Sequence, residues 1–311
     1  MSILTQLFAN KIYTLAPMAA YTDLPFRSVV KQFGCDLTFS EMTNVNAISY
    51  NNEKTQKMLQ KSPQESPYFV QIAANNTENA KKAVEIINEI PWIDGIDINL
   101  GCPVSKARRS GFGGVLLKEE NQEKLIKIVK TITSTSKKPV SAKIRLGFDK
   151  SNVENISKLL EDLGIEFLTI HGRLVTQMYK GSANYKEIKK AKKAVNIPVI
   201  ANGDITSYQK AKEVLDFTQS DGVAIGRGAV GRPWIFLEMK QKGSITPAQK
   251  KEVILTHLKE MVNFYGEYGV ILFRKHAHAY SKGTKNASEF RSKINKATSY
   301  EEVKELIEKH F

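Results

Sequence analysis

The sequence predicts an α/β fold, a (β/α)8 TIM barrel followed by a small all-helical C-terminal domain. Eight short apolar runs alternate along the chain with longer segments of helical periodicity, as in parallel strands joined by helices. No glycine-rich dinucleotide fingerprint follows the first run, which favours a closed barrel over an open nucleotide-binding sheet. The sequence pattern changes after residues 233–236, and no strand-like run occurs from about residue 246 onward. We therefore expect the barrel over residues 1–240 and the helical domain over residues 241–311.

Each expected strand is short, apolar and bounded by polar or turn-forming residues. In chain order the eight strands lie at residues 13–17, 37–40, 68–73, 95–100, 140–145, 167–171, 199–202 and 222–226. Amphipathic segments with the apolar spacing of helices lie at residues 78–89, 119–134, 153–163, 185–194 and 208–217. In the C-terminal domain, Thr246 is a suitable helix cap and Pro247 a suitable first-turn residue, so a helix should begin there.

Composition limits the class of protein. The chain has 311 residues, 41% of them hydrophobic, which is enough for a large core. Two cysteines cannot form a disulfide framework, and the five histidines show no zinc spacing, so we expect no metal. The N-terminus lacks the features of a signal peptide, and no apolar stretch is long enough to span a membrane. We expect a cytoplasmic monomer that has no membrane contact.

The net charge of +14 is compatible with a polyanionic partner and equally with a basic, solvated surface. In the helical domain, basic residues that include Arg274 and Lys275 are interleaved with His276 and Tyr280. A charge run is often only a solvated helix face, whereas interleaved rings favour contact with a nucleic acid backbone. We therefore interpret this domain as a nucleic-acid-binding surface.

Cys102 is the first candidate for chemistry. It follows the expected strand at residues 95–100 within a Gly/Pro turn, and the active site of a barrel lies at the carboxyl ends of its strands. A thiol in such a loop can carry a proton, and the basic residues that follow it, Lys106 among them, suit a polyanion. Cys35 stands among apolar neighbours, so we interpret it as a small core residue.

Polar or small residues stand at the ends of the other expected strands. Lys143 and Arg145 share one face of their strand because side chains alternate, and Gly226 and Arg227 fall in the loop where barrels commonly hold a phosphate. Taken singly, each is as well explained by a structural ion pair or a satisfied core residue. Together they predict a flavin mononucleotide site, in which Lys143 stabilises negative charge on the reduced ring. The small or polar residues that fall on this rim are Ala16, Pro17, Met18, Gln71, Lys143, Arg145, His171, Asn202, Gly203, Asp204, Gly226 and Arg227.

Six segments together resemble the tRNA-dihydrouridine synthases. They are residues 16–27, 99–103, 143–145, 171–173, 202–204 and 226–228, and they occur in the family's order over nearly the whole chain. Residues 231–236 and the helical segment 274–283 resemble the bacterial B-type branch. The chain departs from the pattern at Ala20, where the family usually has glycine, and at Ala279, where it usually has an aromatic residue.

The resemblance implies an FMN-bound barrel and a helical tRNA-binding domain, which use NADPH to reduce the C5–C6 double bond of uridine in the tRNA D-loop. It implies that Cys102 is the general acid, which protonates C5 after hydride reaches C6 from reduced FMN. It also implies the flavin-binding residues, which are Ala16, Pro17, Met18, Gln71, Lys143, His171, Asn202, Gly203, Asp204, Gly226 and Arg227. Asn99, Lys106 and Arg145 match positions near the substrate base or its phosphates. Arg274 and Lys275 are the expected tRNA contacts of the helical domain.

Two other functions remain open on the sequence. Another FMN-dependent barrel oxidoreductase, such as one acting on dihydroorotate, shares the phosphate loop and the lysine but needs no basic helical domain. A non-catalytic RNA-binding protein on the same fold keeps the positive charge but does not need Cys102, Lys143 and His171 on one rim.

Overall fold

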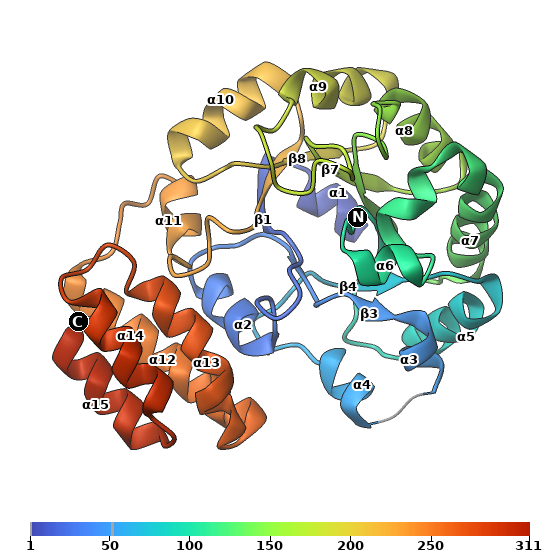
Figure 1. Ribbon diagram of the computed structural model, residues 1–311. Coiled ribbons are helices and arrows are strands. Elements are labelled where there is room, and N and C mark those ends of the chain that lie inside the picture. The colour runs from blue at the N-terminus through green and yellow to red at the C-terminus, as the bar shows by residue number, and fades with distance from the viewer. Residues whose placement is uncertain (1, 51–52) are drawn as a thin grey trace.

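A barrel of eight parallel strands makes up most of the chain, and a group of helices lies beside it (Figure 1). The computed structural model describes residues 2–50 and 53–311. Neighbouring strands follow the order β1-β9-β8-β7-β6-β5-β4-β2, and a parallel bridge between Thr14 and Leu37 brings β1 next to β2 and closes the ring. The barrel strands are β1 (Ile12–Leu15), β2 (Thr38–Phe39), β4 (Tyr68–Ala73), β5 (Gly95–Leu100), β6 (Val140–Arg145), β7 (Phe167–His171), β8 (Val199–Asn202) and β9 (Gly222–Ile225). The predicted fold class is confirmed. Seven expected strands contain an observed one, and the first, expected at residues 13–17, overlaps β1, which begins at Ile12.

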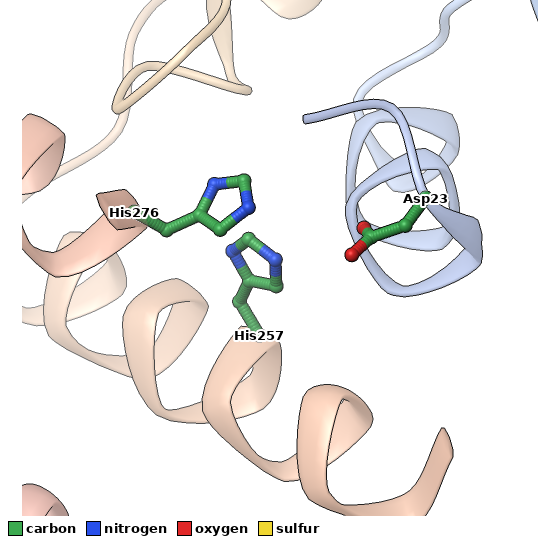
Figure 2. Close-up of side chains that lie close together, drawn as sticks. All are labelled: Asp23, His257 and His276. Carbon is green, nitrogen blue, oxygen red and sulfur yellow. The ribbon is translucent and has the colours of Figure 1, made fainter. Parts of the chain in front are cut away.

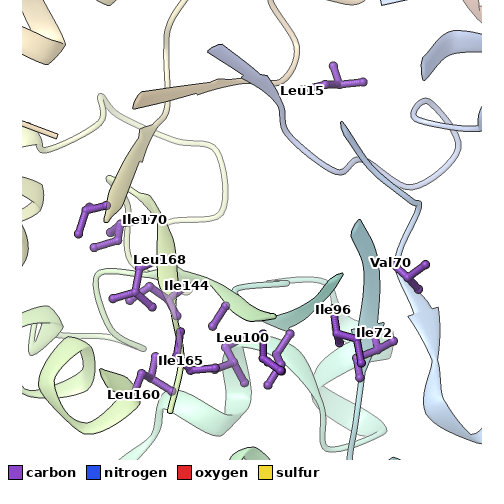
Figure 3. Close-up of a cluster of buried hydrophobic side chains, with 14 of the residues drawn as sticks. Leu15, Val70, Ile72, Ile96, Leu100, Ile144, Leu160, Ile165, Leu168 and Ile170 are labelled. Atoms are coloured by element: carbon purple, nitrogen blue, oxygen red, sulfur yellow. The ribbon is translucent and has the colours of Figure 1, made fainter. Parts of the chain in front are cut away.

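Helices cover the outside of the barrel and pack one apolar face against the strands (Figures 1 and 3). In α5, for example, the buried residues recur every three or four positions, as in an amphipathic helix. The longer helices are α2 (Leu24–Gln32), α5 (Thr77–Asn88), α7 (Gln122–Thr135), α8 (Val153–Asp162), α9 (Tyr185–Ala194) and α10 (Tyr208–Thr218). The short elements are α1 (Ile3–Leu7), β3 (Thr43–Asn44), α3 (Val45–Ser49), α4 (Glu53–Met58), α6 (Ser105–Arg109), η1 (Gly113–Leu117), η2 (Glu119–Asn121) and α11 (Ile235–Met239).

One expected helix begins later than predicted. The segment at residues 119–134 divides into the 3-10 turn η2 and helix α7, because the chain bends between them at Asn121, whose φ and ψ are −105° and 6°. These angles lie outside the helical region, so the ladder of α-helical hydrogen bonds starts only after this residue.

The barrel interior has an apolar floor and a polar upper layer. Phe69 and Phe167, near the amino ends of their strands, pack with ring centres 5.5 Å apart, and Phe8 after α1 covers Phe167 from below. Side chains two residues further along a strand share the same face. Gln71, two residues beyond Phe69, and His171, four beyond Phe167, therefore lie above this floor, toward the carboxyl ends of the strands.

The C-terminal helices are α12 (Pro247–Tyr265), α13 (Tyr268–Tyr280), α14 (Ala287–Lys296) and α15 (Tyr300–His310). As predicted, α12 begins after Thr246, which forms a capping box with Gln249, and Pro247 occupies its first turn. These helices have a core of their own, in which Trp234 stacks on Tyr280. α12 packs against α2 of the barrel. Across residues 2–50 and 53–311, the helices are too short or too polar to cross a membrane.

Candidate active site

Most of the predicted site residues meet at the carboxyl ends of the barrel strands. The Lys143 Nζ atom on β6 donates to Asn202 Oδ1 on β8 at 3.2 Å. A Cβ atom added to Gly226 would lie 3.4 Å from Met18 Sδ and 3.7 Å from Ala16 Cβ, so the first and last strand ends also adjoin. Side chains from distant parts of the sequence thus share one rim.

A chain of hydrogen bonds leads from the barrel interior to the Cys102 loop. The buried Asp97 carboxylate accepts from Gln71 Nε2 at 2.7 Å and from Ser141 Oγ at 2.7 Å. Gln71 Oε1 in turn accepts from Asn99 Nδ2 at 2.8 Å, and Asn99 Oδ1 accepts from the backbone N–H of Cys102 at 3.0 Å. Because each group fixes the donor and acceptor ends of the next, this chain sets the orientation of the Gln71 and Asn99 amides.

Asp97 was missed by the sequence analysis. The sequence feature that could have identified Asp97 is its position on β5, two residues before Asn99 and therefore on the same inward face. Burial raises the pKa of Asp97 to about 6, against the hydrogen bonds from Gln71 and Ser141 and the charge of Lys143, which lower it. Asn99 was predicted near the substrate base, and the structure shows its side chain holding the turn that carries Cys102.

Cys102 is a free, half-buried thiol. The glycines that follow it pack around it: Gly114 donates its N–H to the Cys102 carbonyl at 3.0 Å, and a Cβ on Gly113 would lie 3.0 Å from Cys102 Cβ. Glycine suits position 113 because it lies so close to Cys102 and because its φ is +72°.

Cys35 is the other cysteine, and it is buried. Its Sγ donates to the Leu37 carbonyl at 3.3 Å, and burial raises its pKa to about 12. The interpretation of Cys35 as a core residue is confirmed.

Four cationic side chains act on His171. Burial, and then the charges of Lys143, Arg145, Arg173 and Arg227, together lower the pKa of His171 to about 2, so the imidazole is neutral at pH 7. Arg173 Nη1 lies 3.2 Å from His171 Nε2. Since a guanidinium can only donate, Nε2 accepts and the proton of the neutral ring is on Nδ1. Burial, together with the charge of Arg145, lowers the pKa of Lys143 to about 8.

The turn after β8 is held in an unusual backbone conformation. Gly203 and Asp204 have φ values of +123° and +54°. Arg173, which lies in the family-like segment 171–173 but was not among the predicted site residues, donates to both Asp204 oxygens at 2.9 and 2.7 Å. Tyr185 Oη donates to the Gly203 carbonyl at 2.6 Å. Arg227 from the next loop lies 3.7 Å from Asp204. These contacts fix the turn beside the loop at Gly226.

The two glycine-containing turns present free backbone donors. Within residues 2–50 and 53–311, the N–H groups of Gly203, Asp204, Gly226 and Arg227 have no hydrogen-bond acceptor. Unpaired amides grouped beside a guanidinium form a favourable site for a phosphate. The donor set therefore fits the phosphate of a mononucleotide.

Arg145 holds a loop beside the rim. Its Nη1 atom donates to the carbonyls of Leu174 and Met178 at 2.8 and 2.6 Å. The half-exposed ring of Tyr179 in this loop lies 5.6 Å from Arg145 Cζ and 5.1 Å from Arg227 Cζ. Cations near its face stabilise the ring by cation–π interaction. Tyr179 was also missed by the sequence analysis. The feature that could have identified it is that it is a lone aromatic residue in a polar loop.

A profile described as "Dihydrouridine synthase (Dus)" matches residues 14–311 of the chain. The chain belongs to the dihydrouridine synthase family. It is 46% identical over 308 residues to a "Probable tRNA-dihydrouridine synthase" of Helicobacter pylori (strain ATCC 700392 / 26695). The alignment covers 98% of this chain and 93% of that protein. It is 41% identical to "tRNA-dihydrouridine synthase B" of Pasteurella multocida (strain Pm70), over 97% and 93% of the two chains.

Solved structures resemble this dihydrouridine synthase in fold. Morphinone reductase in complex with tetrahydroNAD superposes with a TM-score of 0.56 at 11% identity, covering 80% of this chain and 94% of that chain. A variant of NCR from Zymomonas mobilis superposes with a TM-score of 0.53 at 16% identity, over 83% and 94% of the two chains. These similarities confirm the barrel architecture.

The structure explains the family's usual glycine at the position of Ala20. This residue has φ +66°, a left-handed conformation that glycine adopts without strain and alanine adopts only at a cost. Its N–H group donates to a Glu41 carboxylate oxygen, which helps to hold the turn. The second departure from the family pattern is Ala279. It packs closely against Gly231, because a Cβ atom added to Gly231 would lie 2.9 Å from Ala279 Cβ.

The cations that were predicted to contact tRNA differ in their surroundings. Arg274 Nη2 donates to the carbonyl of Ala297 at 2.8 Å and so satisfies the end of α14. Lys275 points toward the barrel, with its Nζ atom 5.5 Å from the Tyr21 ring centre. Lys106 lies in α6, and its side chain is outside the part of the chain that the structure describes.

Proposed function

We propose that this dihydrouridine synthase reduces the C5–C6 double bond of uridine in the D-loop of tRNA, with FMN as bound cofactor and NADPH as reductant. The observation that carries the proposal is the free Cys102 thiol on the same rim as Lys143 and a group of unpaired backbone amides. Family membership and the names of the relatives support it.

The residues on the rim suit FMN. The amides of Gly203, Asp204, Gly226 and Arg227, with the Arg227 guanidinium, would hold the phosphate. The missing side chain of Gly226, beside Ala16 and Met18, leaves space for a flat ring. Lys143, Gln71, His171, Asn202 and Pro17 complete the set that would hold the flavin. When bound, FMN supplies the hydride that adds to C6 of uracil.

The protein itself supplies the proton. Cys102 Sγ holds it, and the Asn99 amide fixes the backbone N–H of the same residue, so the thiol has a set position relative to the rim. A general acid must lie within hydrogen-bond reach of the atom that it protonates, here C5 of the base. Arg145 contributes by holding the loop of Tyr179, whose exposed ring offers a stacking surface to a base.

The helical domain and the positive charge of the chain suit tRNA. An enzyme that acts on a paired or stacked base must take it out of its stack, and contacts to the phosphate backbone stabilise that state. The net charge of +14 and the placement of Lys275 toward the barrel support a tRNA path that joins the helical domain to the mouth.

The test is the rate of dihydrouridine formation in unmodified tRNA by the Cys102→Ala variant, with mass spectrometry as readout. We expect flavin content to be unchanged and the rate to fall by about 100-fold or more, because the proton donor is lost. Cys35→Ala is the matched control, since it removes the other, buried thiol and should leave the rate unchanged.

Three results would contradict the proposal in different ways. If the Cys102→Ala variant forms dihydrouridine at the parental rate, Cys102 is not the general acid. Turnover of dihydroorotate without any effect on tRNA would indicate a different flavin-dependent barrel enzyme. A colourless protein that cannot be loaded with FMN would indicate a binding protein rather than an enzyme.

A further inference from the structure

Three side chains that are far apart in the sequence meet where the helical domain packs against the barrel. Asp23 precedes α2, His257 lies on α12 and His276 lies on α13. Figure 2 shows the two imidazole rings side by side, with the carboxylate facing them. All three side chains are buried, and one possible ligand atom of each lies within 4.8 Å of the others.

The imidazole nitrogens lack partners although they are buried. His257 Nδ1 lies 3.1 Å from Tyr280 Oη, whereas His257 Nε2 and both nitrogens of His276 have no hydrogen-bond partner among the described residues. Buried polar atoms in native proteins are nearly always paired, so each exception needs an explanation. A neutral imidazole has one N–H group and one lone pair, so one of the two His276 nitrogens carries the ring proton. The lone pairs of His257 Nε2 and of the other His276 nitrogen, both opposite one carboxylate, are explained by a ligand that accepts lone pairs, which is a cation.

The surroundings suit a bound metal ion. The Phe26 ring lies 5.5 Å from that of His257 and 5.3 Å from that of His276, and Phe273 packs against both, so the cluster has an apolar wall. Tyr280 fixes the ring of His257 through the nitrogen that does not face the cluster, as second-shell groups do for metal-bound histidines.

The nearby charges are of both signs. Asp23 supplies one negative charge, and Glu41 adds to the negative field around it. Arg27 and Lys275 act on the same cluster with positive charge and oppose a cation. Asp23 also accepts from the Phe26 N–H at 3.2 Å and from Tyr265 Oη at 3.3 Å, which hold its carboxylate toward the helical domain.

We propose that Asp23, His257 and His276 bind one divalent transition-metal ion of the zinc class, with water as the fourth ligand. Two imidazoles and one carboxylate are a frequent set for zinc, whose bonds to nitrogen and oxygen are about 2.0–2.2 Å long. Tetrahedral bonds of that length place ligand atoms about 3.3 Å apart, so the three side chains move closer together on binding.

This ion would join the barrel to the helical domain. Asp23 directly follows Thr22, whose hydroxyl accepts from the backbone N–H of Met18 in the predicted flavin loop. The two histidines come from α12 and α13. A metal held by all three therefore fixes the helical domain relative to the mouth of the barrel. The inference does not rest on the proposed reaction, because metal binding is measured without tRNA.

The test uses the full-length, flavin-containing protein, stripped of metal with EDTA and then exposed to Zn²⁺ and passed through a desalting column. We expect about one tightly held zinc per chain by elemental mass spectrometry, and a melting temperature that rises with zinc. X-ray absorption at the zinc edge should show nitrogen and oxygen neighbours with imidazole scattering. Absence of retained zinc, or a sulfur neighbour that places the ion at a cysteine, would overturn the proposal.

Variants locate the ion. His276→Gln and Asp23→Asn should each lose the bound zinc, while His278→Gln, on the same helix but hydrogen-bonded to Asn295 at the surface, should keep it. Asn is a good helix cap, so Asp23→Asn preserves the start of α2 and decides the matter even if His276→Gln fails to fold. Zinc retained by a folded Asp23→Asn protein at parental affinity, or lost equally in His278→Gln, would refute the site.

Discussion

The Asp97 carboxylate lies fully buried beneath the barrel mouth and accepts hydrogen bonds from Gln71 and Ser141. It contacts none of the atoms expected to react, yet it orients Gln71, which orients Asn99, which holds the backbone of Cys102. Single residues in this protein therefore act through their neighbours as well as directly. Two others, Ala20 and Lys143, have properties that can be tested alone.

Ala20→Gly should stabilise the protein. Ala20 is exposed and has φ +66°, so the substitution removes backbone strain and loses little packing. We expect a gain of about 0.5–1 kcal/mol in the free energy of unfolding, measured by urea denaturation. Ala248→Gly, at an exposed position in α12, is the control and should destabilise by about the same amount. Equal destabilisation by both changes would show that the turn at Ala20 carries no strain.

The rate of tRNA reduction should fall as pH rises through about 8. Burial lowers the pKa of Lys143 to about 8, so above that value its ammonium loses the charge that would stabilise a reduced flavin. Folding lowers this pKa from the ordinary 10.5, so the buried charge opposes folding, and this opposition is relieved between pH 8 and 10.5. The measurement is the pH profile of dihydrouridine formation.

Lys143→Arg distinguishes this lysine from other groups. Arginine keeps its charge at alkaline pH, so the fall should move to higher pH even if the absolute rate is lower. A fall near pH 8 that persists unchanged in the arginine variant would instead show that a group other than Lys143 causes it.

At the scale of elements, the loop between β7 and α9 is shaped by two arginines. Arg145 donates to the carbonyls of Leu174 and Met178, and Arg173 donates to those of Lys180 and Gly181. Both arginines belong to segments that resembled the family, but these bonds inside the loop could not be inferred from a motif. Their result is that the loop presents the Tyr179 ring beside the mouth.

Tyr179→Ala should weaken tRNA use and leave the flavin spectrum unchanged. Stacking of a base on an aromatic ring contributes about 1–3 kcal/mol, so we expect KM for tRNA to rise by roughly 5- to 150-fold. Phe217→Ala, which removes an exposed ring on the outer helix α10, is the matched control. An unchanged KM in the Tyr179 variant would show that the ring contacts no base.

At the scale of the whole molecule, the barrel and the helical domain meet through α2 and α12, close to the loop expected to hold the flavin. The helical domain has its own apolar core, but Trp234, which precedes α11, is part of it. The predicted boundary at residue 240 therefore falls after a residue that the helical core uses. Arg274 lies within this domain, whereas Lys275 faces the barrel.

Arg274 and Lys275 should give different results when replaced. Lys275→Ala should weaken tRNA binding and reduce the slope of log affinity against log salt by about one, as expected for one lost phosphate contact. Arg274→Ala should instead reduce the stability of the folded protein by about 1–2 kcal/mol, because the Ala297 carbonyl loses its donor. Salt titrations of binding and thermal melts separate the two. Identical salt slopes for Lys275→Ala and the parental protein would exclude a phosphate contact.

Local patterns in the sequence were sufficient for the fold and for much of the predicted rim. Alternating apolar runs predict strands because every second side chain must be buried, and the carboxyl ends of parallel strands necessarily meet. Cys102, Lys143, His171 and Asn202 could be assigned to that edge for this reason. Gly203 was named because residues 202–204 end a strand and resemble the family, and the structure adds that its φ is +123°, which suits glycine.

Only the tertiary structure decided which partner each polar group has. Asp97 is buried because two neighbouring strands bring Gln71 and Ser141 to it, and no spacing along the chain encodes that contact. Asp23, His257 and His276 meet only because α12 and α13 pack against the start of α2. Hydrogen bonds and metal ligation act over a few ångströms, so they depend on how distant segments pack, whereas the strand and helix patterns depend on residues close in the chain.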